Sequence, residues 1–296
     1  MTQLVSRRAP ETDGLLRSLA TLQKVFDVTV VLNYRRYFEW AVSACNSLQK
    51  PRQTRDNYRW PDADTLEDIT FARWYAGLYE KGACPTCTYN WAKFFDPAYH
   101  PTESVARQYE ALLPGVHINL YDLHQEGTVV TNFVCQALPH ARDACAALAR
   151  RDRTAAAPLV LNPTHPARSE YDRLLLGAQR KKMVSTRRRR TVTRHALEAA
   201  FPALGARPKL PRVCPDGAAL RELRERSVRY ERAVYARYFP LPEDAGRREE
   251  YLAGLAAAHV AAFEVYVKEQ KFCNWDIEWL LEQDKALRKW FKKYPN

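Results

Sequence analysis

The sequence predicts an α/β fold, with a small, mainly parallel sheet in the first half and a mostly helical second half. Two observations predict the sheet: Val28–Leu32 and Val116–Leu123 have strand character, and helical patterns lie between them. A third predicts the helical half, because apolar residues recur at helical spacing almost throughout 170–296. These observations favour one α/β core with a helical region added to it.

The first predicted elements are a helix, a strand and a second helix. Residues 14–26 place leucines on one helical face, and Asp13 is suited to cap that helix. The run Val28–Leu32 is β-branched and continuously apolar, which is typical of a strand covered on both faces. A cation-rich turn at 34–36 follows, and helical spacing continues to about Lys50.

Helices and strands also alternate in the predicted elements from residue 51 to about residue 150. Residues 51–64 are polar and aromatic and predict a surface loop, and 65–80 predict a helix. A helix from Pro101 is stopped by Pro114-Gly115, where the second strand begins. The apolar segment 129–148 predicts one further helix, so the layout is βαβ-like.

A change in composition predicts the domain organisation. Residues 151–169 are rich in Ala, Arg and Pro and predict a linker. We therefore expect a partial α/β core at 1–150 and a helical C-terminal region at 170–296 that packs on it. Within that region, proline clusters at 208–215 and 240–242 separate the predicted helices.

Charge and hydropathy narrow the classes of partner. The 296 residues carry a net charge of +12, and eight basic residues fall in Arg180–Arg194, which holds no acid. Negatively charged partners such as nucleotides, sulfated glycans or nucleic acids are therefore favoured. No run approaches the ~20 apolar residues that span a bilayer, and the first residues lack the apolar core of a signal peptide.

The seven cysteines reveal no framework by their spacing. Cys84-Pro-Thr-Cys87 has the form of half a zinc site or a redox pair, but no second motif follows at finger-like spacing. A disulfide or two free thiols is favoured, and no metal site is predicted. The redox compartment is left open.

The turn after the first strand is the best candidate site. Arg35 and Arg36 lie where a strand ends and a helix begins, which is where α/β proteins bind ligands and where helix N–H groups favour anions. Ser43 follows two helical turns later and is placed to reach the same anion. The alternative is an ordinary turn with solvated arginines, in which Arg36 only pairs with Glu39 or Asp27.

These residues resemble the 3′-phosphate-binding element of sulfotransferases, an arginine at a strand end followed by a helical serine. Val116–Leu123 resembles the family strand that runs into a Tyr-Glu-Asp-Leu-type turn, with Asp122 in a shortened turn. The overall likeness is to sulfotransferase-like proteins of eukaryotic algae. It rests on four segments: YRRYFEW (34–40), NFVC-x-x-LP (132–139), YDR (171–173) and FC-x-x-D (272–276).

The resemblance implies a P-loop-like fold that binds the sulfate donor PAPS and moves a sulfuryl group onto a hydroxyl or amine acceptor, which includes carbohydrates. Arg35 and Ser43 would hold the 3′-phosphate, and Arg36 would replace Arg35 if the register shifts by one. A Golgi-lumenal location would follow if a longer chain carries an N-terminal anchor.

One feature of the family is not found in the sequence, namely the donor loop for the 5′-phosphosulfate, which should precede Val28. We expect either a truncated enzyme, which we favour, or a relative that has lost donor activation. The alternatives are a non-catalytic anion- or glycan-binding protein and, less favoured, a nucleic-acid-binding protein that uses 180–194. That segment is also interpreted as a solvated loop or as a phosphate or glycan contact. No family motif identifies a catalytic base among His100, His117, His124 and His140.

Overall fold

The computed structural model describes residues 17–48, 70–80, 98–124, 129–152, 166–207 and 210–294. These residues form two compact units, each built from three stretches of the chain. Unit 1 comes from 1–39, 90–163 and 223–262, and unit 2 from 40–89, 164–222 and 263–296. The predicted division at 151–169 stays a prediction, since 153–165 lie outside the described residues.

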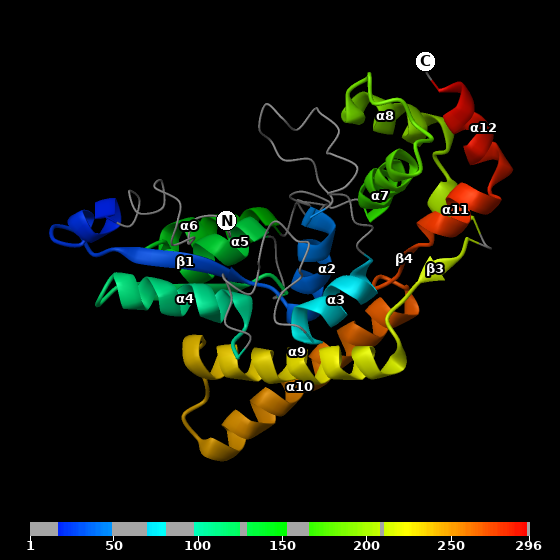
Figure 1. Cartoon of the computed structure of the whole chain (residues 1–296). Helices are drawn as coiled ribbons and strands as arrows, with labels where there is room; N and C mark the ends of the chain where they lie inside the picture. The colour runs from blue at the N-terminus through cyan, green and yellow to red at the C-terminus, as the bar shows by residue number, and fades with distance from the viewer. Residues whose placement is uncertain are drawn as a thin grey trace. The chain divides into compact units, whose positions relative to one another are not determined.

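Helices dominate both units, and a small parallel sheet lies in unit 1 (Figure 1). Unit 1 contains β1 (Thr29–Tyr34), α4 (Pro101–Leu112), β2 (His117–Asp122), α5 (Val129–Asn132), the π-helical turn η5 (Phe133–Ala137) and α6 (Arg142–Asp152). Unit 2 contains α3 (Phe71–Glu80), α7 (Pro166–Arg180), α8 (Arg190–Ala200), the 3-10 turn η6 (Leu204–Ala206), β3 (Arg212–Val213), β4 (Asn274–Trp275), α11 (Ile277–Gln283) and α12 (Lys285–Lys293). Among the described helices, α2 (Tyr37–Leu48), α9 (Gly217–Tyr238) and α10 (Ala245–Lys268) have residues in both units.

The predicted α/β class is confirmed in this coarse form. β1 and β2 pair in parallel, with Thr29 opposite His117 and Tyr34 opposite Asp122. Helix α4 immediately precedes β2 and lies along β1 (Figure 1). Because the two strands are parallel and in register, their carboxyl ends lie side by side at Tyr34 and Asp122.

The core of unit 1 forms where the sheet meets α9 and α10. Tyr34 and Leu120 from the strands are buried with Val234 and Tyr235 of α9 and Leu252 of α10. Aromatic contacts reinforce this packing, since Tyr235 stacks on Phe239 with ring centroids 4.3 Å apart. The side chains that end β1 and β2 are therefore covered by two long helices.

The predicted helix at 129–148 is wrong in one respect, because it is divided. The chain forms α5 and η5, breaks at residues 138–141, and resumes as α6. Pro139 explains the break, since proline offers no N–H to a helix and disfavours helical backbone at Leu138. A disulfide between Cys135 and Cys145 joins the two parts.

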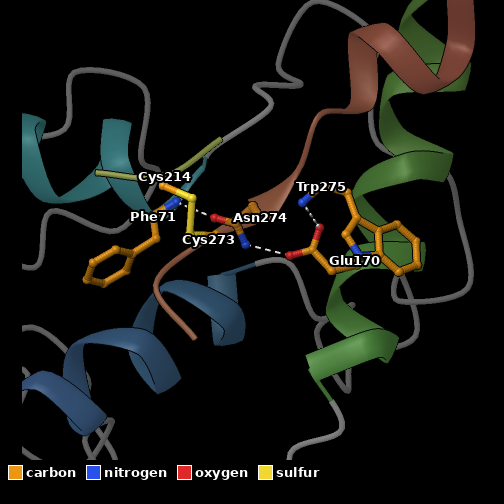
Figure 2. The surroundings of a disulfide bond; sticks show 6 residues. All are labelled: Phe71, Glu170, Cys214, Cys273, Asn274 and Trp275. Carbon is orange, nitrogen blue, oxygen red and sulfur yellow. Dashed lines mark hydrogen bonds between the residues drawn. A yellow bond between two sulfur atoms is a disulfide. The ribbon is translucent and has the colours of Figure 1, made fainter. Parts of the chain in front are cut away.

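Unit 2 has an apolar core formed by α7, α8, α11 and α12, with the buried Trp275 of β4. A second disulfide, Cys214–Cys273, joins β3 to β4, which form a short antiparallel pair. Figure 2 shows the polar contacts beside it: Glu170 of α7 accepts hydrogen bonds from the Asn274 side chain (2.5 Å) and the Trp275 N–H (3.0 Å). The Asn274 side-chain oxygen accepts one from the Phe71 N–H (2.6 Å), which ties α3 to the same cluster.

Some sequence predictions fall outside the described residues. These include the polar loop at 51–64 and the Cys84/Cys87 motif. Within the described part of the chain, no helix is long and apolar enough to span a bilayer, and no group of His, Cys, Asp and Glu side chains has the arrangement of a metal site.

Candidate functional site

The predicted strand–turn–helix element is present, with the strand, the turn and the first residues of the helix in unit 1. β1 ends at Tyr34, residues 35 and 36 form the turn, and α2 begins at Tyr37. Asp122, opposite Tyr34, ends β2 at the same edge of the sheet. The side chains of these strand ends meet residues from α4, α9 and α10, and we call the resulting group the strand-end cluster. It consists of Tyr34, Arg35, Arg36, Glu39, His100, Asp122, His124, Ser227, Glu231, Tyr235 and His259.

Arg35 and Arg36 both lie in the strand-end cluster, and each faces a carboxylate. The Arg35 Nε is 3.3 Å from Glu39 Oε2, and the Arg35 side chain is 35% exposed. The Arg36 Nε is 3.8 Å from Glu231 Oε1, which is an ion-pair distance but too long for a hydrogen bond. That buried Nε has no hydrogen-bond acceptor among the described residues. The alternative pairing of Arg36 with Glu39 or Asp27 is thus replaced by a pairing with Glu231.

Ser43 lies on α2, two turns beyond its first residue, and is half-buried. It belongs to the stretch of α2 in unit 2, whereas Arg35 and Arg36 belong to unit 1. Its shared role with Arg35 stays a prediction.

Two histidines hold the turn in place as hydrogen-bonding groups. His100 caps α4: its Nδ1 accepts the Thr102 N–H (3.0 Å), so its proton is on Nε2, which donates to the Arg35 carbonyl (3.0 Å). His124 Nε2 accepts the Arg36 N–H (3.2 Å) and lies 3.3 Å from Glu39 Oε2. Both imidazoles act as acceptors in these contacts and are therefore neutral.

Burial explains their neutrality. Desolvation lowers the pKa of His100 from its ordinary value to about 3, against a smaller opposing effect of the Arg35 carbonyl. Desolvation also lowers the pKa of His124 to about 3, and the charges of Arg36 and Arg35 lower it further. At neutral pH neither histidine adds positive charge to the site.

The carboxylates of the cluster are also buried. Desolvation raises the pKa of Asp122, although the Tyr235 hydroxyl donates to one of its oxygens and the His124 N–H (2.8 Å) donates to the other. Desolvation likewise raises the pKa of Glu39, against the lowering effect of Arg35 and Arg36. The Tyr34 hydroxyl donates to Glu231 (3.1 Å), and its pKa is raised by burial and by that carboxylate.

Ser227, His259 and Glu231 are buried close together next to the first turn of α2. His259 Nε2 is 2.6 Å from the Ser227 Oγ, and its Nδ1 is 2.7 Å from Glu231 Oε2. The order of the three residues matches a serine–histidine–carboxylate triad, but the His259–Glu231 contact lacks hydrogen-bond geometry. In addition, Ser227 and His259 have no exposed surface, and the serine oxygen accepts the Phe38 N–H (3.3 Å). The Ser227 oxygen thus holds the first turn of α2, and these three residues lack the exposed nucleophile that acyl transfer requires.

Sequence reasoning missed most of this cluster because its members are far apart in the chain. Asp122 was expected only as part of a turn, and no role was expected for Ser227, Glu231 or His259. The available signal was the face of α9, where Ser227 lies between Leu223 and Tyr230 at helical spacing. A small polar residue on an apolar face indicates a buried partner, but the partner itself cannot be read from α9.

The strand-end cluster therefore combines two arginines, three carboxylates and three histidines at one edge of a parallel sheet. Its groups can bind a negatively charged ligand through the arginines or exchange protons through Glu39 and Asp122. In comparisons with known proteins, no family model, no curated protein and no solved structure matches this chain.

Proposed function

We propose that the turn between β1 and α2 binds the 3′-phosphate of a nucleotide, and that the chain is a PAPS-dependent sulfotransferase or part of one. The observation that carries this proposal is the pair of arginines at the carboxyl edge of the parallel strands. In particular, the Arg36 Nε is buried there without a hydrogen-bond acceptor in the described part of the chain. A buried donor of this kind costs free energy until an acceptor is supplied.

Guanidinium groups, and not the helix N-terminus, would hold the phosphate. The Arg36 and Phe38 N–H groups already donate to His124 and Ser227. Arg35 is the more exposed of the two arginines and offers a planar, charged group suited to phosphate.

Glu39 would change partner when the phosphate binds. It faces both Arg35 (3.3 Å) and His124 (3.3 Å), so it competes with an anion for the Arg35 guanidinium. Sulfuryl transfer needs a base for the acceptor proton and positive charge beside the leaving phosphate. Arg35 and Arg36 would hold the 3′-phosphate, which is a different group from the leaving 5′-phosphate, so we assign neither the base nor the cation of the transfer step to these residues.

A second candidate function is anion or glycan binding without catalysis. It is favoured by the charge balance of the cluster, because Glu39 and Glu231 already face the arginines and both neighbouring histidines are neutral. Such a site would bind an anion more weakly than an uncompensated arginine pair. An assay for sulfuryl transfer from PAPS to carbohydrate or amine acceptors separates this candidate from the enzyme.

Calorimetric titration with PAP, the desulfated donor product, tests the binding step, with AMP as the control ligand. Binding of PAP and not of AMP supports a site for the 3′-phosphate. Equal binding of both, or of neither, would contradict it. Arg107→Ala is a matched control variant, because Arg107 is 36% exposed and pairs with Glu103 at 2.8 Å in the same i,i+4 arrangement as Arg35 and Glu39.

A further inference from the structure

We propose that unit 2 carries a second site, a basic surface that binds an anionic polysaccharide with sulfate or carboxylate groups. We define the basic surface as Arg187, Arg188 and Arg189, which precede α8, together with Lys289, Lys292 and Lys293 of α12. It shares no residue with the strand-end cluster and does not depend on the function proposed for that cluster.

The structure divides the basic segment 180–194 into an inner and an outer part. Arg190, the first residue of α8, and Arg194, one turn later, are buried, with side-chain nitrogens 3.4 Å and 3.2 Å from Asp172. They serve the fold of unit 2. Arg187, Arg188 and Arg189 are exposed. The interpretation of the whole segment as a solvated loop is therefore wrong for its last residues. The exposed basic residues are Arg180, Lys181 and Lys182 at its start, where Lys181 pairs with Glu282, and the three consecutive arginines 187–189.

Helix α12 adds a second row of cations. Its residues Leu287 and Phe291 are buried in the core of unit 2, and Lys289, Lys292 and Lys293 are exposed. The helix contains no acidic residue. The Arg188 guanidinium lies over the ring of Tyr294 at 5.8 Å, directly after Lys293, so the two basic segments meet in space.

Aromatic rings lie within this basic surface. Trp290 stacks on Tyr294 with ring centroids 4.2 Å apart and nearly parallel planes, and both side chains are partly exposed. The nearest acids along the chain are already engaged: Asp284 caps α12 and pairs with Arg207, and Glu282 pairs with Lys181 (2.5 Å). Extended cationic charge beside stacked rings suits a polymer that has both anionic groups and flat faces.

The disulfides favour a polysaccharide over a nucleic acid. Cys135–Cys145 and Cys214–Cys273 are both formed, and disulfides persist in oxidising compartments, where the abundant anionic polymers are glycans. The sequence also contains no recognised nucleic-acid-binding motif. Sulfate and carboxylate groups would contact the arginines and lysines, and sugar rings would contact the exposed parts of the Trp290 and Tyr294 side chains.

Titration with a heparin oligosaccharide tests this surface. In the variant Arg187→Ser/Arg188→Ser/Arg189→Ser, we expect affinity for heparin to fall at least tenfold and its dependence on salt to become shallower, because fewer counterions are released. The matched control is Arg221→Ser/Arg229→Ser/Arg247→Ser, which removes three exposed arginines elsewhere. We expect the control to retain most of the affinity.

Further measurements make the result decisive. Circular dichroism and thermal melting confirm that both triple variants fold, and Tyr294→Ala tests the aromatic contribution without changing charge. PAP binding should be unchanged in the Arg187–Arg189 variant, so this proposal and the nucleotide site can fail separately. Equal loss of heparin affinity in both triple variants would show that the site is not at Arg187–Arg189. Tighter binding of single-stranded DNA than of a heparin oligosaccharide of equal charge would show that the ligand is not a polysaccharide.

Discussion

Two buried polar clusters, one in each unit, use their hydrogen bonds differently. In unit 2, Glu170 accepts hydrogen bonds from Arg173 (2.7 Å), the Asn274 side chain and the Trp275 N–H, and a disulfide closes the same region. In unit 1, the strand-end cluster contains two histidines with lowered pKa values and two carboxyl groups with raised pKa values. It also contains the Arg36 Nε, which has no hydrogen-bond acceptor among the described residues.

The difference indicates which cluster serves the fold and which is a candidate for function. The carboxylate of Glu170 joins α7 to β4 and, through Asn274, to α3, as a structural anchor does. The strand-end cluster holds ionisable groups in environments that disfavour their charged forms. Proteins tolerate that cost most often at functional sites.

The largest expected effect is on the structural anchor. Glu170→Ala leaves the buried Arg173 and Asn274 without their shared acceptor. We expect the free energy of unfolding to fall by about 3–5 kcal/mol, as it does when one partner of a buried ion pair is removed. Urea denaturation followed by circular dichroism measures the change.

The control for this change is Glu282→Ala, which removes an exposed partner of Lys181. Exposed ion pairs contribute roughly 0–1 kcal/mol, so this variant should be nearly as stable as the wild type. Similar losses in the two variants would show that Glu170 is no special anchor, and the contrast between the clusters would lose its basis.

The next effect is a loss of stability in acid caused by His100. Its pKa is about 3 in the folded chain, below the ordinary histidine value of about 6.5. Between these values the unfolded chain binds more protons than the folded chain, so stability is lost as pH falls from about 6.5 towards 3. The size is of the order of a few kcal/mol, since each unit of pKa shift corresponds to about 1.4 kcal/mol.

Chemical denaturation from pH 7 to pH 4 checks this dependence. His100→Gln removes the titrating group, so we expect a lower stability at pH 7 and a flatter profile below pH 6.5. His195→Gln serves as a control in unit 2. A variant at position 100 that keeps the full acid dependence of the wild type would contradict the assignment of this loss to His100.

The sequence was most informative where local pattern decides structure. Val28–Leu32 and Val116–Leu123 predicted the two strands, and the structure places β1 and β2 there in parallel. The turn at Arg35 and the start of a helix just after it were also predicted correctly. These features depend on β-branched runs and helical spacing, which are visible within about ten residues.

The partners of the arginines were not predictable in the same way. Glu231 and His259 lie some two hundred residues from Arg36, and only the packing of α9 and α10 on the sheet brings them to the turn. The same holds for Arg188 and Tyr294 in unit 2. Sequence alone therefore showed which cations are present, but not which of them pair with a carboxylate. Such pairing matters because a paired arginine binds an anion more weakly.

The next largest expected effect is a loss of PAP affinity when Arg35 is replaced. Loss of a hydrogen bond to a charged group costs about 1.5–3 kcal/mol, so Arg35→Ala should weaken PAP binding by roughly ten- to a hundredfold. The Arg107→Ala variant controls for loss of a similar i,i+4 pair in unit 1. Calorimetry measures both, and unchanged PAP affinity in Arg35→Ala would remove this arginine from the site.

The smallest expected effect has the opposite sign and concerns Glu39. This carboxylate faces the Arg35 guanidinium at 3.3 Å and would compete with phosphate for it. Glu39→Gln removes the competing charge, so PAP should bind about two- to fivefold more tightly, in line with the ~0.5–1 kcal/mol of a partly exposed pair. If the Arg35–Glu39 pair only stabilises the turn, PAP should bind more weakly to both the Arg35→Ala and the Glu39→Gln variant, and that result would contradict the prediction.

The pH dependence sharpens this last test. Burial raises the pKa of Glu39, so in the wild type its charge is lost at a higher pH than for an ordinary carboxyl group. The advantage of Glu39→Gln in PAP affinity should therefore shrink as pH falls through that raised pKa, while Glu103→Gln, which alters the matching pair of α4, should show no such trend. An advantage that stays constant from pH 7 to pH 4 would mean that the charge of Glu39 does not oppose the ligand.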